Sequence, residues 1–589
     1  MRTLLLAGLL AATPAVAAAQ SAVTVPAAAA GIAAAAQPLP LVSGLTVDQR
    51  SKYRSIFAAI RSNDWTAARA GIDALPNGPL TDVAEAELIL AKGSPKASDD
   101  SVTMLLTSSA ELPQGAELAA IASRRGLTTG ALPTIRDLIR FAGPSKRQSA
   151  RAQRNDRAAA ALAQVAGPMV RNDQPSEAEV LVTARLNDLS PEAQAEWLHR
   201  VAWAYYLSGD DANARRVADR ARPGVGDWAV QANWVAGLAA WRQKDCAAAG
   251  LAFEQVSSRA RDPEMIAAGL YWASRADMAC NHPERVEARL RSAARMKESF
   301  YGLISQAALG LTDDGGSNMK LTANDWSAIG AIPNVRRATA LAEIGETALA
   351  DQLLRHQARI GLSRDHESLV HLAARLNLPA TQIWLAQNGP SGARLSASSR
   401  YPMPGWTPPS GWQVDKALIF AHALQESQFR TDATSPAGAR GVMQLMPGTA
   451  QMIARHQGRT LDPSSLSQPA TSIDLGQAYL RELGGMNATG GLLPKVIAAY
   501  NAGPTSVANW NARGRNLADP LLFIESIPFV ETRAYVAIVL RNYWMYQRQA
   551  GAKPASLMAI SQGLWPRFPG LPGRDAIRMT SLGAPAAAD

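Results

Sequence analysis

Glu426 is a lone carboxylate in a mostly apolar run, FAHALQESQF. The apolar spacing upstream predicts a helix over residues 414–429, with Glu426 beside its buried stripe and close to its C-terminal end. Apolar surroundings and the negative end of a helix dipole both raise the pKa of a carboxyl group. A glutamate that stays protonated at neutral pH can serve as a general acid, the role such groups play in sugar cleavage. The same pattern also fits a surface glutamate in the last turn of a helix.

The segment that follows contains two glycines and the string MQLMP. Gly438 and Gly441 bracket a turn, which places Gln444 and Met446 on a short helical stretch near the glutamate. Glycine lets the backbone approach a ligand closely, and an amide and a thioether suit the lining of a sugar site. Taken alone, Met446 is more typical of a hydrophobic core.

A second polar group stands at the end of an apolar helix in VIAAYNAGPTSVANW. Tyr500 and Asn501 precede the turn at Gly503 and Pro504, where a hydroxyl and an amide can both face a cleft. A capped helix with a packed tyrosine explains the same residues.

Two further carboxylates flank a proline in LLFIESIPFVETRAYV. Glu525 precedes the proline and Glu531 follows it, and we expect a helix to begin near Thr532. Glu531 or Thr532 would cap this helix, and Arg533 would pair with a carboxylate.

Four blocks in this order, QESQF, SPAGARGVMQLMPGTA, AAYNAGP and FIESIPFVETRAYV, resemble the soluble lytic murein transglycosylases, the exported exolytic class. The resemblance covers about residues 414–546 and weakens upstream. It implies that Glu426 is the single catalytic acid and base. We expect the sugar cleft to be lined by the substrate-binding residues Ser435, Gln444, Met446, Tyr500, Asn501 and Glu525. Ser472 departs from the family, which usually has asparagine there, and we expect only a local change of helix capping.

The resemblance implies cleavage of the β-1,4 bond between N-acetylmuramic acid and N-acetylglucosamine without water. The muramic O6 hydroxyl would attack its own C1 and leave a 1,6-anhydro product, with neither metal nor cofactor. The implied partner is the peptidoglycan glycan strand, with cell-wall synthesis enzymes as further candidates, and the chain is expected to be a monomer. Two alternatives stay open: a hydrolase of the goose-type lysozyme kind, and an envelope scaffold that only grips glycan.

The chain has 589 residues, too many for one core, and carries a formal net charge of +10. Its basic residues are interspersed with acidic ones, so no nucleic acid partner is expected and an anionic cell-envelope polymer fits better. Residues 1–20 have the basic start, apolar run and small-residue end of a signal peptide cleaved near Ala19. We therefore expect a periplasmic protein with no integral membrane segment.

The rest of the chain predicts an all-α fold. Helix pairs recur at 53–75, 201–221, 235–256 and 269–293, and the last three start about 34 residues apart, near the tetratricopeptide period. Stacked pairs would form a curved α-solenoid, although a helical bundle is the alternative; the resemblance implies a superhelix of ring or U shape. The predicted parts are a flexible lead-in (21–44), a helical-repeat superhelical domain (45–300), a helical linker domain (301–400), a lysozyme-like, mainly helical transglycosylase domain (401–549) and a partly disordered C-terminal tail (550–589).

Cys246 and Cys280 are the only cysteines, 34 positions apart. In an oxidising compartment they could form a disulfide, for which chain entropy suggests about 3–4 kcal/mol. Two buried free thiols fit the sequence equally well.

Overall fold

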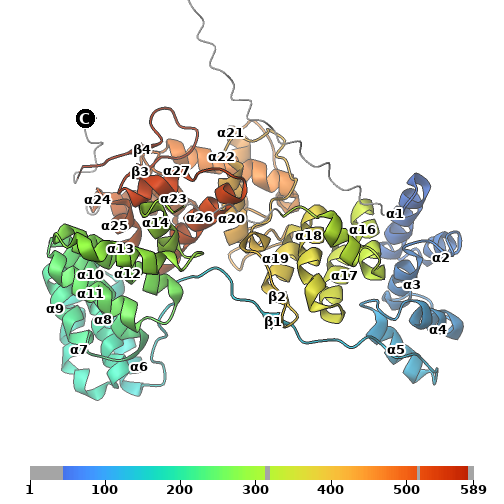
Figure 1. Ribbon diagram of the computed structural model, residues 1–589, viewed down its shortest axis with the longest axis horizontal. Coiled ribbons are helices and arrows are strands. Elements are labelled where there is room, and N and C mark those ends of the chain that lie inside the picture. Colours follow the sequence, from blue (N-terminus) through green and yellow to red (C-terminus); the bar gives the residue numbers. More distant parts are fainter. Residues whose placement is uncertain (1–43, 312–318, 514–517, 581–589) are drawn as a thin grey trace, which may run out of the picture. The chain divides into compact units, whose positions relative to one another are not determined.

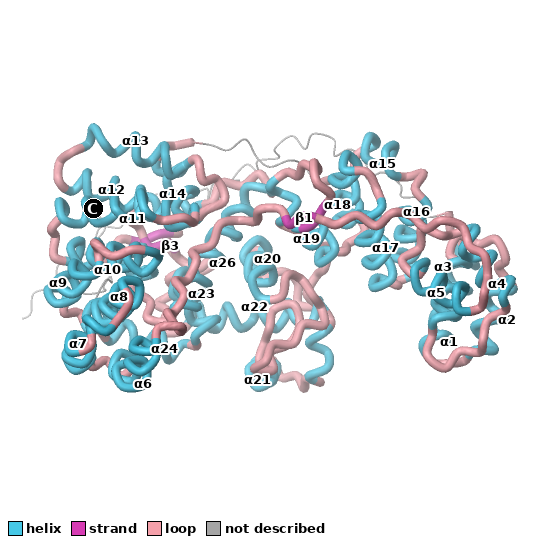
Figure 2. Tube along the Cα trace, turned by 90° about the horizontal axis from the view of Figure 1, so that it is seen from below, coloured by secondary structure: helices cyan, strands magenta, loops and turns pink. Residues whose placement is uncertain are grey.

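The structure is a computed structural model that describes residues 44–311, 319–513 and 518–580. The predicted signal peptide and almost all of the lead-in lie outside the described residues. The described chain is mainly helical, and its strands are two-residue pairs (Figures 1 and 2). The expectation of an all-α fold is confirmed.

The first helices pack against helices from the middle of the chain and share one hydrophobic core with them (Figure 1). The early members are α1 (Val47–Arg61), α2 (Trp65–Asp73), α3 (Thr81–Leu90), α4 (Asp99–Ser108) and α5 (Gly115–Arg124). Their middle partners are α15 (Ala323–Ile329), α16 (Pro333–Ile344), α17 (Thr347–Ile360), α18 (His366–Arg375) and α19 (Pro379–Gln387). Ion pairs join the two sets: Arg50 lies 2.5 Å from Glu343, and Arg61 lies 2.7 Å from Glu346.

A second run of helices follows a long connection. It comprises α6 (Arg157–Arg171), α7 (Pro175–Ala184), α8 (Pro191–Ser208), α9 (Asp211–Ala221), α10 (Gly226–Arg242), α11 (Cys246–Arg259), α12 (Pro263–Ala279), α13 (Pro283–Ala294) and α14 (Phe300–Ala308). The predicted turn after α8 is confirmed, because Gly209 has φ +82° and the Asp210 side chain accepts a hydrogen bond from the amide of Asn213. Each predicted repeat stretch is a helix, a turn and a second helix.

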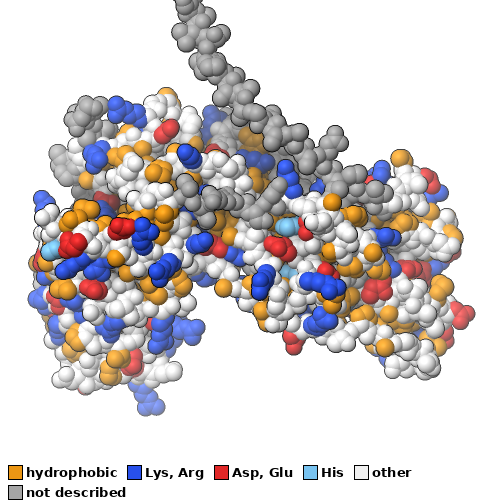
Figure 3. Space-filling view, viewed as in Figure 1, with side chains coloured by type: hydrophobic (Ala, Val, Ile, Leu, Met, Phe, Trp, Pro, Cys, Tyr) orange, Lys and Arg blue, Asp and Glu red, His pale blue; other side chains and the backbone are white. Residues whose placement is uncertain are grey.

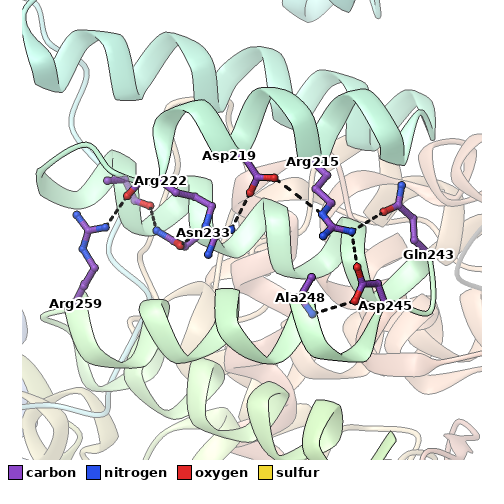
Figure 4. Close-up of polar contacts among 9 residues, drawn as sticks. Arg215, Asp219, Arg222, Asn233, Gln243, Asp245, Ala248 and Arg259 are labelled. Carbon is purple, nitrogen blue, oxygen red and sulfur yellow. Dashed lines mark hydrogen bonds and ion pairs between the residues drawn. The ribbon is translucent and has the colours of Figure 1, made fainter. Parts of the chain in front are cut away.

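Polar contacts as well as alanine packing hold these repeats together (Figure 4). Arg215 of α9 lies 2.7 Å from Asp245, which caps α11. Arg222 donates to the Oδ1 of Asn233 on α10, and Arg259 of α11 donates to the Arg222 carbonyl at 2.7 Å. These bonds tie three successive helices and satisfy groups at helix ends that packing alone would leave unpaired.

The last helices carry the candidate site. They are α20 (Lys416–Glu426), α21 (Pro447–His456), α22 (Pro469–Gly485), α23 (Leu493–Ala502), α24 (Pro504–Ala512), α25 (Pro520–Glu525), α26 (Val530–Gln549) and α27 (Ala555–Ser561). Short 3₁₀ turns lie at Leu186–Asp188, Ser363–Asp365, Ala397–Arg400 and Pro463–Ser467. The strands are β1 (Ile139–Arg140), which pairs antiparallel with β2 (Asn388–Gly389), and β3 (Trp565–Pro566), which pairs antiparallel with β4 (Ala576–Ile577).

Aromatic side chains of the C-terminal segment are buried. We expected residues 550–589 to be a partly disordered tail. In the described part, Trp565 is fully buried and packs on Phe523 at 5.4 Å between ring centroids, and Phe568 is buried too. These aromatic side chains attach the described part of the segment to the core, and its partial disorder stays a prediction.

One hydrophobic core joins residues from α6–α14 to residues from α20–α27. Helix α14 belongs to this core and spans the predicted domain boundary at residue 300. The predicted domain boundaries stay predictions. On the face in Figure 3, basic and acidic side chains are interspersed, as the sequence indicates. None of the helices in the described ranges has the length and apolar character that crossing a membrane requires.

Cys246, the first residue of α11, and Cys280, directly after α12, form a disulfide with a Cα–Cα distance of 5.6 Å. The structure thus selects the disulfide over the two free thiols.

Candidate active site

Helix α20 delivers Glu426 as its last residue. We expected the helix to span residues 414–429, but it ends three residues earlier, because Gln428 and Phe429 have φ values of +53° and +61°. Every residue from Leu418 to Ala423 is buried, so the helix is enclosed all round. The prediction that Glu426 lies at a helix C-terminus beside apolar packing is confirmed.

Glu426 is half-buried and makes one strong hydrogen bond. The Tyr535 hydroxyl, from α26, donates to its Oε1 at 2.6 Å. Burial raises the pKa of Glu426 to about 7, the Tyr535 hydrogen bond lowers it, and the negative charge of Glu531 raises it further. Glu426 can therefore exist as an acid and as a carboxylate near neutral pH.

A neutral histidine packs beneath this glutamate. His422 Nδ1 donates to the Leu418 carbonyl at 3.0 Å, and burial lowers the pKa of His422 to about 4. Its ring lies 4.9 Å from the ring of Tyr500 and 6.0 Å from that of Tyr535. The uncharged ring fixes both tyrosines and adds no charge beside Glu426.

The turn between Ala433 and Leu445 positions Gln444. Its Nε2 donates to the carbonyls of Ala433 at 3.0 Å and Gly441 at 2.9 Å, so its Oε1 is not used in those bonds. We expected a short helical stretch here, but Gln444 has φ +46°, and α21 begins only at Pro447. The two bridges at Arg440, to Thr434 and Leu445, hold this irregular backbone.

Ser472 supports the same turn from below. It is fully buried in α22, and its Oγ accepts a hydrogen bond from the Met443 amide at 3.1 Å. The expectation of a helix-capping change is wrong, because Gln468 is the N-cap and uses no side-chain bond. Ser472 instead fixes the backbone next to Gln444.

The end of α23 brings Tyr500 and Asn501 to the site. The Tyr500 hydroxyl donates to the Met443 carbonyl at 2.8 Å, and Asn501 Oδ1 accepts from the Thr532 hydroxyl at 2.6 Å. Thr532 is thus used in a bond between helices. Helix α26 begins at Val530 with Phe529 as a N-cap that uses no side-chain bond, so the expected capping by Glu531 or Thr532 is wrong.

Ser435 and Met446 stand at the two ends of the turn. Ser435 Oγ accepts from the Ala439 amide at 3.0 Å, which closes the loop around Gly438. Met446 is 44% exposed, which is unusual for a methionine in a core and leaves its thioether accessible to a ligand.

Glu525 is not brought together with these residues. It is buried, and its carboxylate accepts two bonds from Arg147, at 2.7 and 3.0 Å, and one from the Tyr301 hydroxyl at 2.7 Å. Arg147 lies in the connection before α6 and Tyr301 lies in α14, so Glu525 links α25 to both segments. Arg533 also differs from expectation: in the described part of the chain it forms no ion pair and stacks over Trp203, 4.3 Å from the ring centroid.

Two residues at the site have roles that were not predicted from the sequence. Tyr535 lies within the quoted block ending in ETRAYV, one helical turn beyond Thr532, and that spacing was the available signal. Glu531, considered only as a helix cap, is exposed and acts on Glu426 through its charge.

Residues 409–523 match the family model described as Transglycosylase SLT domain. The chain therefore contains a transglycosylase SLT domain, and this domain holds Glu426, Gln444 and Tyr500.

Two curated proteins show the similarity of this domain to known sequences. The Soluble lytic murein transglycosylase of Escherichia coli (strain K12) is 36% identical over 157 residues, 26% of this chain and 24% of that protein. The Putative soluble lytic murein transglycosylase of Haemophilus influenzae is 39% identical over 139 residues, 23% of this chain and 22% of that protein. The matches thus span about a quarter of the length of these curated relatives.

Solved structures extend the likeness of fold to most of the chain. The 70 kDa soluble lytic transglycosylase of Escherichia coli matches with a TM-score of 0.51 and 17% identity, over 88% of this chain and 99% of that one. An inactive mutant of the lytic transglycosylase Slt from Pseudomonas aeruginosa matches with a TM-score of 0.51 and 19% identity, over 87% and 90%. The chain therefore has the fold of these proteins, an N-terminal helical region followed by an SLT domain.

Proposed function

We propose that this protein is a peptidoglycan lytic transglycosylase that cleaves the β-1,4 bond between N-acetylmuramic acid and N-acetylglucosamine without water. The observation that carries the proposal is the environment of Glu426. Its side chain is half-buried, its pKa is about 7, and its Oε1 accepts a hydrogen bond from the Tyr535 hydroxyl. Such a group is populated as an acid and as a base at the same pH, which a reaction with one carboxylate requires.

The first step is protonation of the leaving group. Glu426, protonated on Oε2, donates to the glycosidic oxygen as the bond to C1 breaks. The Tyr535 hydroxyl stays on Oε1 and stabilises the carboxylate that forms. Burial and the charge of Glu426 raise the pKa of Tyr535 well above its usual value, so it remains a neutral hydrogen-bond donor.

The second step closes the ring. Glu426, now a carboxylate, accepts the proton of the muramic O6 hydroxyl as that oxygen bonds to C1, which gives the 1,6-anhydro product and restores the acid. Well-oriented intramolecular groups reach effective molarities of roughly 10⁵–10⁸ M. An internal hydroxyl therefore replaces both a nucleophilic carboxylate and a bound water.

The site geometry supports a set of sugar contacts. The Nε2 of Gln444 is bound to two backbone carbonyls of the turn, and its Oε1 takes no part in those bonds. Met446, two residues further on, is exposed. Ser435, Tyr500 and Asn501 come from the segments that border Gln444 and Glu426. The carboxylate of Glu525 is buried and paired with Arg147 and Tyr301, so it is better suited to holding these two segments in place than to binding sugar.

The names of the relatives agree with this activity. The matched curated proteins are called soluble lytic murein transglycosylases. The solved Pseudomonas aeruginosa protein is described as an inactive mutant in which glutamine replaces one glutamate. Loss of activity on a single substitution of this type is what a mechanism with one carboxylate requires.

Export to the periplasm is part of the proposal. The disulfide between Cys246 and Cys280 supports it, because disulfides persist mainly in oxidising compartments. Peptidoglycan strands are accessible there as substrate, and cell-wall synthesis enzymes would be the nearest protein partners.

Hydrolysis is the second candidate reaction, because the carboxylate of Glu531 is close enough to Glu426 to raise its pKa.

Mass spectrometry of products from purified sacculi distinguishes the two reactions. We expect muropeptide ends that lack one water relative to reducing ends, and we expect Glu426→Gln to lower turnover by at least about 10²–10⁴-fold with folding intact. Reducing ends would refute transglycosylation, and anhydro products from the Glu426→Gln protein would refute the role of Glu426.

A further inference from the structure

A cavity of about 450 Å³ lies on the side of α26 that faces away from Glu426. Helix α26 lines it with Arg533, Ala537 and Arg541, whereas Tyr535, which bonds to Glu426, is absent from its walls. The opposite wall comes from α8, α10 and the segment 145–150. Its volume is in the range of small-molecule sites, and it is separate from the site described above.

The charge of the cavity wall is unbalanced. The basic residues lining it are Lys146, Arg147, Arg200, Arg533 and Arg541, and the acidic ones are Glu264 and Glu525. Glu525 is engaged by Arg147, and Arg200 is paired with Glu196, which lies outside the wall. This leaves Lys146, Arg533 and Arg541 against Glu264. Burial raises the pKa of Glu264 to about 7, so it contributes only part of a negative charge at neutral pH. The cavity is therefore cationic.

Arg533 has no carboxylate partner within the described residues. Its side chain makes no hydrogen bond there, and its Nε is buried. Burial lowers the pKa of Arg533 to about 10, with Arg147 acting in the same direction and Glu525 opposing it, so the guanidinium is still charged at neutral pH. A buried, unpaired charge is costly, and proteins normally compensate it with a counterion or a ligand.

Three other residues of the wall also hold unsatisfied nitrogens. His199 Nδ1, Trp234 Nε1 and Arg541 Nε are buried without a hydrogen-bond partner in the described chain. Buried polar groups are seldom left unpaired, and together with Arg533 these four gather around one cavity.

Tryptophans hold the guanidinium groups in place. Arg533 lies over Trp203 at 4.3 Å, Arg147 over Trp234 at 4.8 Å and Arg200 over Trp228 at 5.2 Å from the ring centroids. Stacking fixes the planes of the three guanidinium groups. The edges of Arg147 and Arg200 are taken by Glu525 and Glu196. The edge of Arg533 is left for an oxyanion, the geometry in which arginine binds carboxylates. The rings also supply an apolar wall for the body of a small ligand.

We propose that this cavity is a second ligand site, which binds the carboxylate-bearing peptide end of a muropeptide. The identity of the ligand rests on the proposed function, because that reaction releases small sugar-peptide molecules whose peptides end in carboxylates. The Arg533 guanidinium receives the carboxylate, and the tryptophan faces of the wall contact the peptide.

The test is binding of a purified anhydro-disaccharide tetrapeptide to the full chain, measured by calorimetry and by tryptophan emission. Matched probes are the same compound with amidated carboxyl groups, the disaccharide without peptide, and inorganic phosphate. We expect the three matched probes to bind at least about thirtyfold more weakly than the free muropeptide, the loss typical of removing one partner of a buried charge pair. Equal binding of the amidated probe, phosphate binding as tight as the muropeptide, or no binding of the muropeptide would overturn the proposal.

Variants place the binding on this side of α26. Arg533→Gln removes the unpaired charge and Ala537→Phe fills the cavity without changing charge, and both should weaken binding by the same order, with the fold checked by thermal melting. Arg364→Gln, at a side chain 81% exposed and outside the cavity wall, is the matched control and should bind as the wild type does. Unchanged binding in both cavity variants would overturn the proposal.

Glu426→Gln separates this inference from the proposed function. It should keep the muropeptide affinity, and loss of binding in this variant would place the probe in the cleavage site and overturn the inference. If the products proved to be hydrolytic while Arg533→Gln still lost binding, the proposed reaction would fail and the second site would stand.

Discussion

At the scale of single residues, Tyr535 and Glu531 act on the pKa of Glu426 in opposite directions. The Tyr535 hydroxyl favours the carboxylate, and the charge of Glu531 favours the acid. Their balance, added to the effect of burial, leaves the pKa of Glu426 at about 7. The identities of both residues therefore decide the pH range in which Glu426 can donate a proton.

The pH profile of kcat/KM should fall on its alkaline side near pH 7, because Glu426 must be protonated to donate. Glu531→Gln removes a repelling charge, lowers the pKa of Glu426 and moves that limb to lower pH. Tyr535→Phe removes a bond to the carboxylate, raises the pKa and moves the limb to higher pH. Initial rates on soluble glycan strands across pH 5–9 measure both. Shifts of the same sign in the two variants would show that Glu426 does not set the limb.

The sequence predicted the position of Glu426 on its helix, because helix ends and apolar spacing are local. It did not reveal Tyr535 as the partner of Glu426, since the two lie 109 positions apart. The same limit explains Glu525, whose partner Arg147 is 378 positions away. Which carboxylate is buried and paired depends on contacts that no local pattern encodes.

At the scale of elements, Gly441 controls the turn that carries Gln444. It has φ +74°, and a Cβ at this position would lie impossibly close to the carbonyl oxygen of Leu466. The backbone there is both left-handed and tightly packed. Glycine is the residue that meets both conditions.

Gly441→Ala should lower the free energy of unfolding by roughly 2–4 kcal/mol and reduce activity by displacing Gln444. Gly448→Ala is the matched control, because Gly448 lies in the first turn of α21 with open space around it. We expect that change to be neutral or slightly stabilising. Urea denaturation of both variants makes the comparison, and equal stabilities would contradict this account of the turn.

Element types were predicted well from the sequence, and element ends less well. The helix predicted over residues 414–429 exists but is shorter, spanning Lys416–Glu426. Nothing in the sequence indicates that Gln428 and Phe429 adopt a left-handed backbone conformation. The string MQLMP was expected to be helical, yet Gln444 gives up helix geometry so that its side chain can hold two carbonyls. Tertiary hydrogen bonds there outweigh local preference.

At the scale of the whole molecule, helices distant in sequence share cores. Residues 45–122 pack with residues 321–385, and residues 159–307 pack with residues of the SLT domain. Periodicity predicts which faces are apolar but not which apolar faces meet, so this grouping could not be read from the sequence. Whether Cys246 and Cys280 are paired could not be predicted from the sequence for the same reason.

Cys280→Ser should destabilise the chain by about 3–4 kcal/mol, because the disulfide closes a loop of 34 positions between α11 and α12. Thermal melting with and without reductant measures the effect. Reductant should lower the melting temperature of the wild type and leave that of the variant unchanged. A wild type insensitive to reductant, under conditions where the thiols are shown to be free, would contradict a stabilising role.

The central claim is that the substrate's own O6 hydroxyl replaces water, so that Glu426 works alone. The most direct measurement is digestion of purified sacculi in water labelled with heavy oxygen, followed by mass spectrometry of the muropeptides. The account predicts anhydro ends that carry no label at C1. Labelled reducing ends formed by the wild-type enzyme, and absent with Glu426→Gln, would contradict it and establish hydrolysis at the same site.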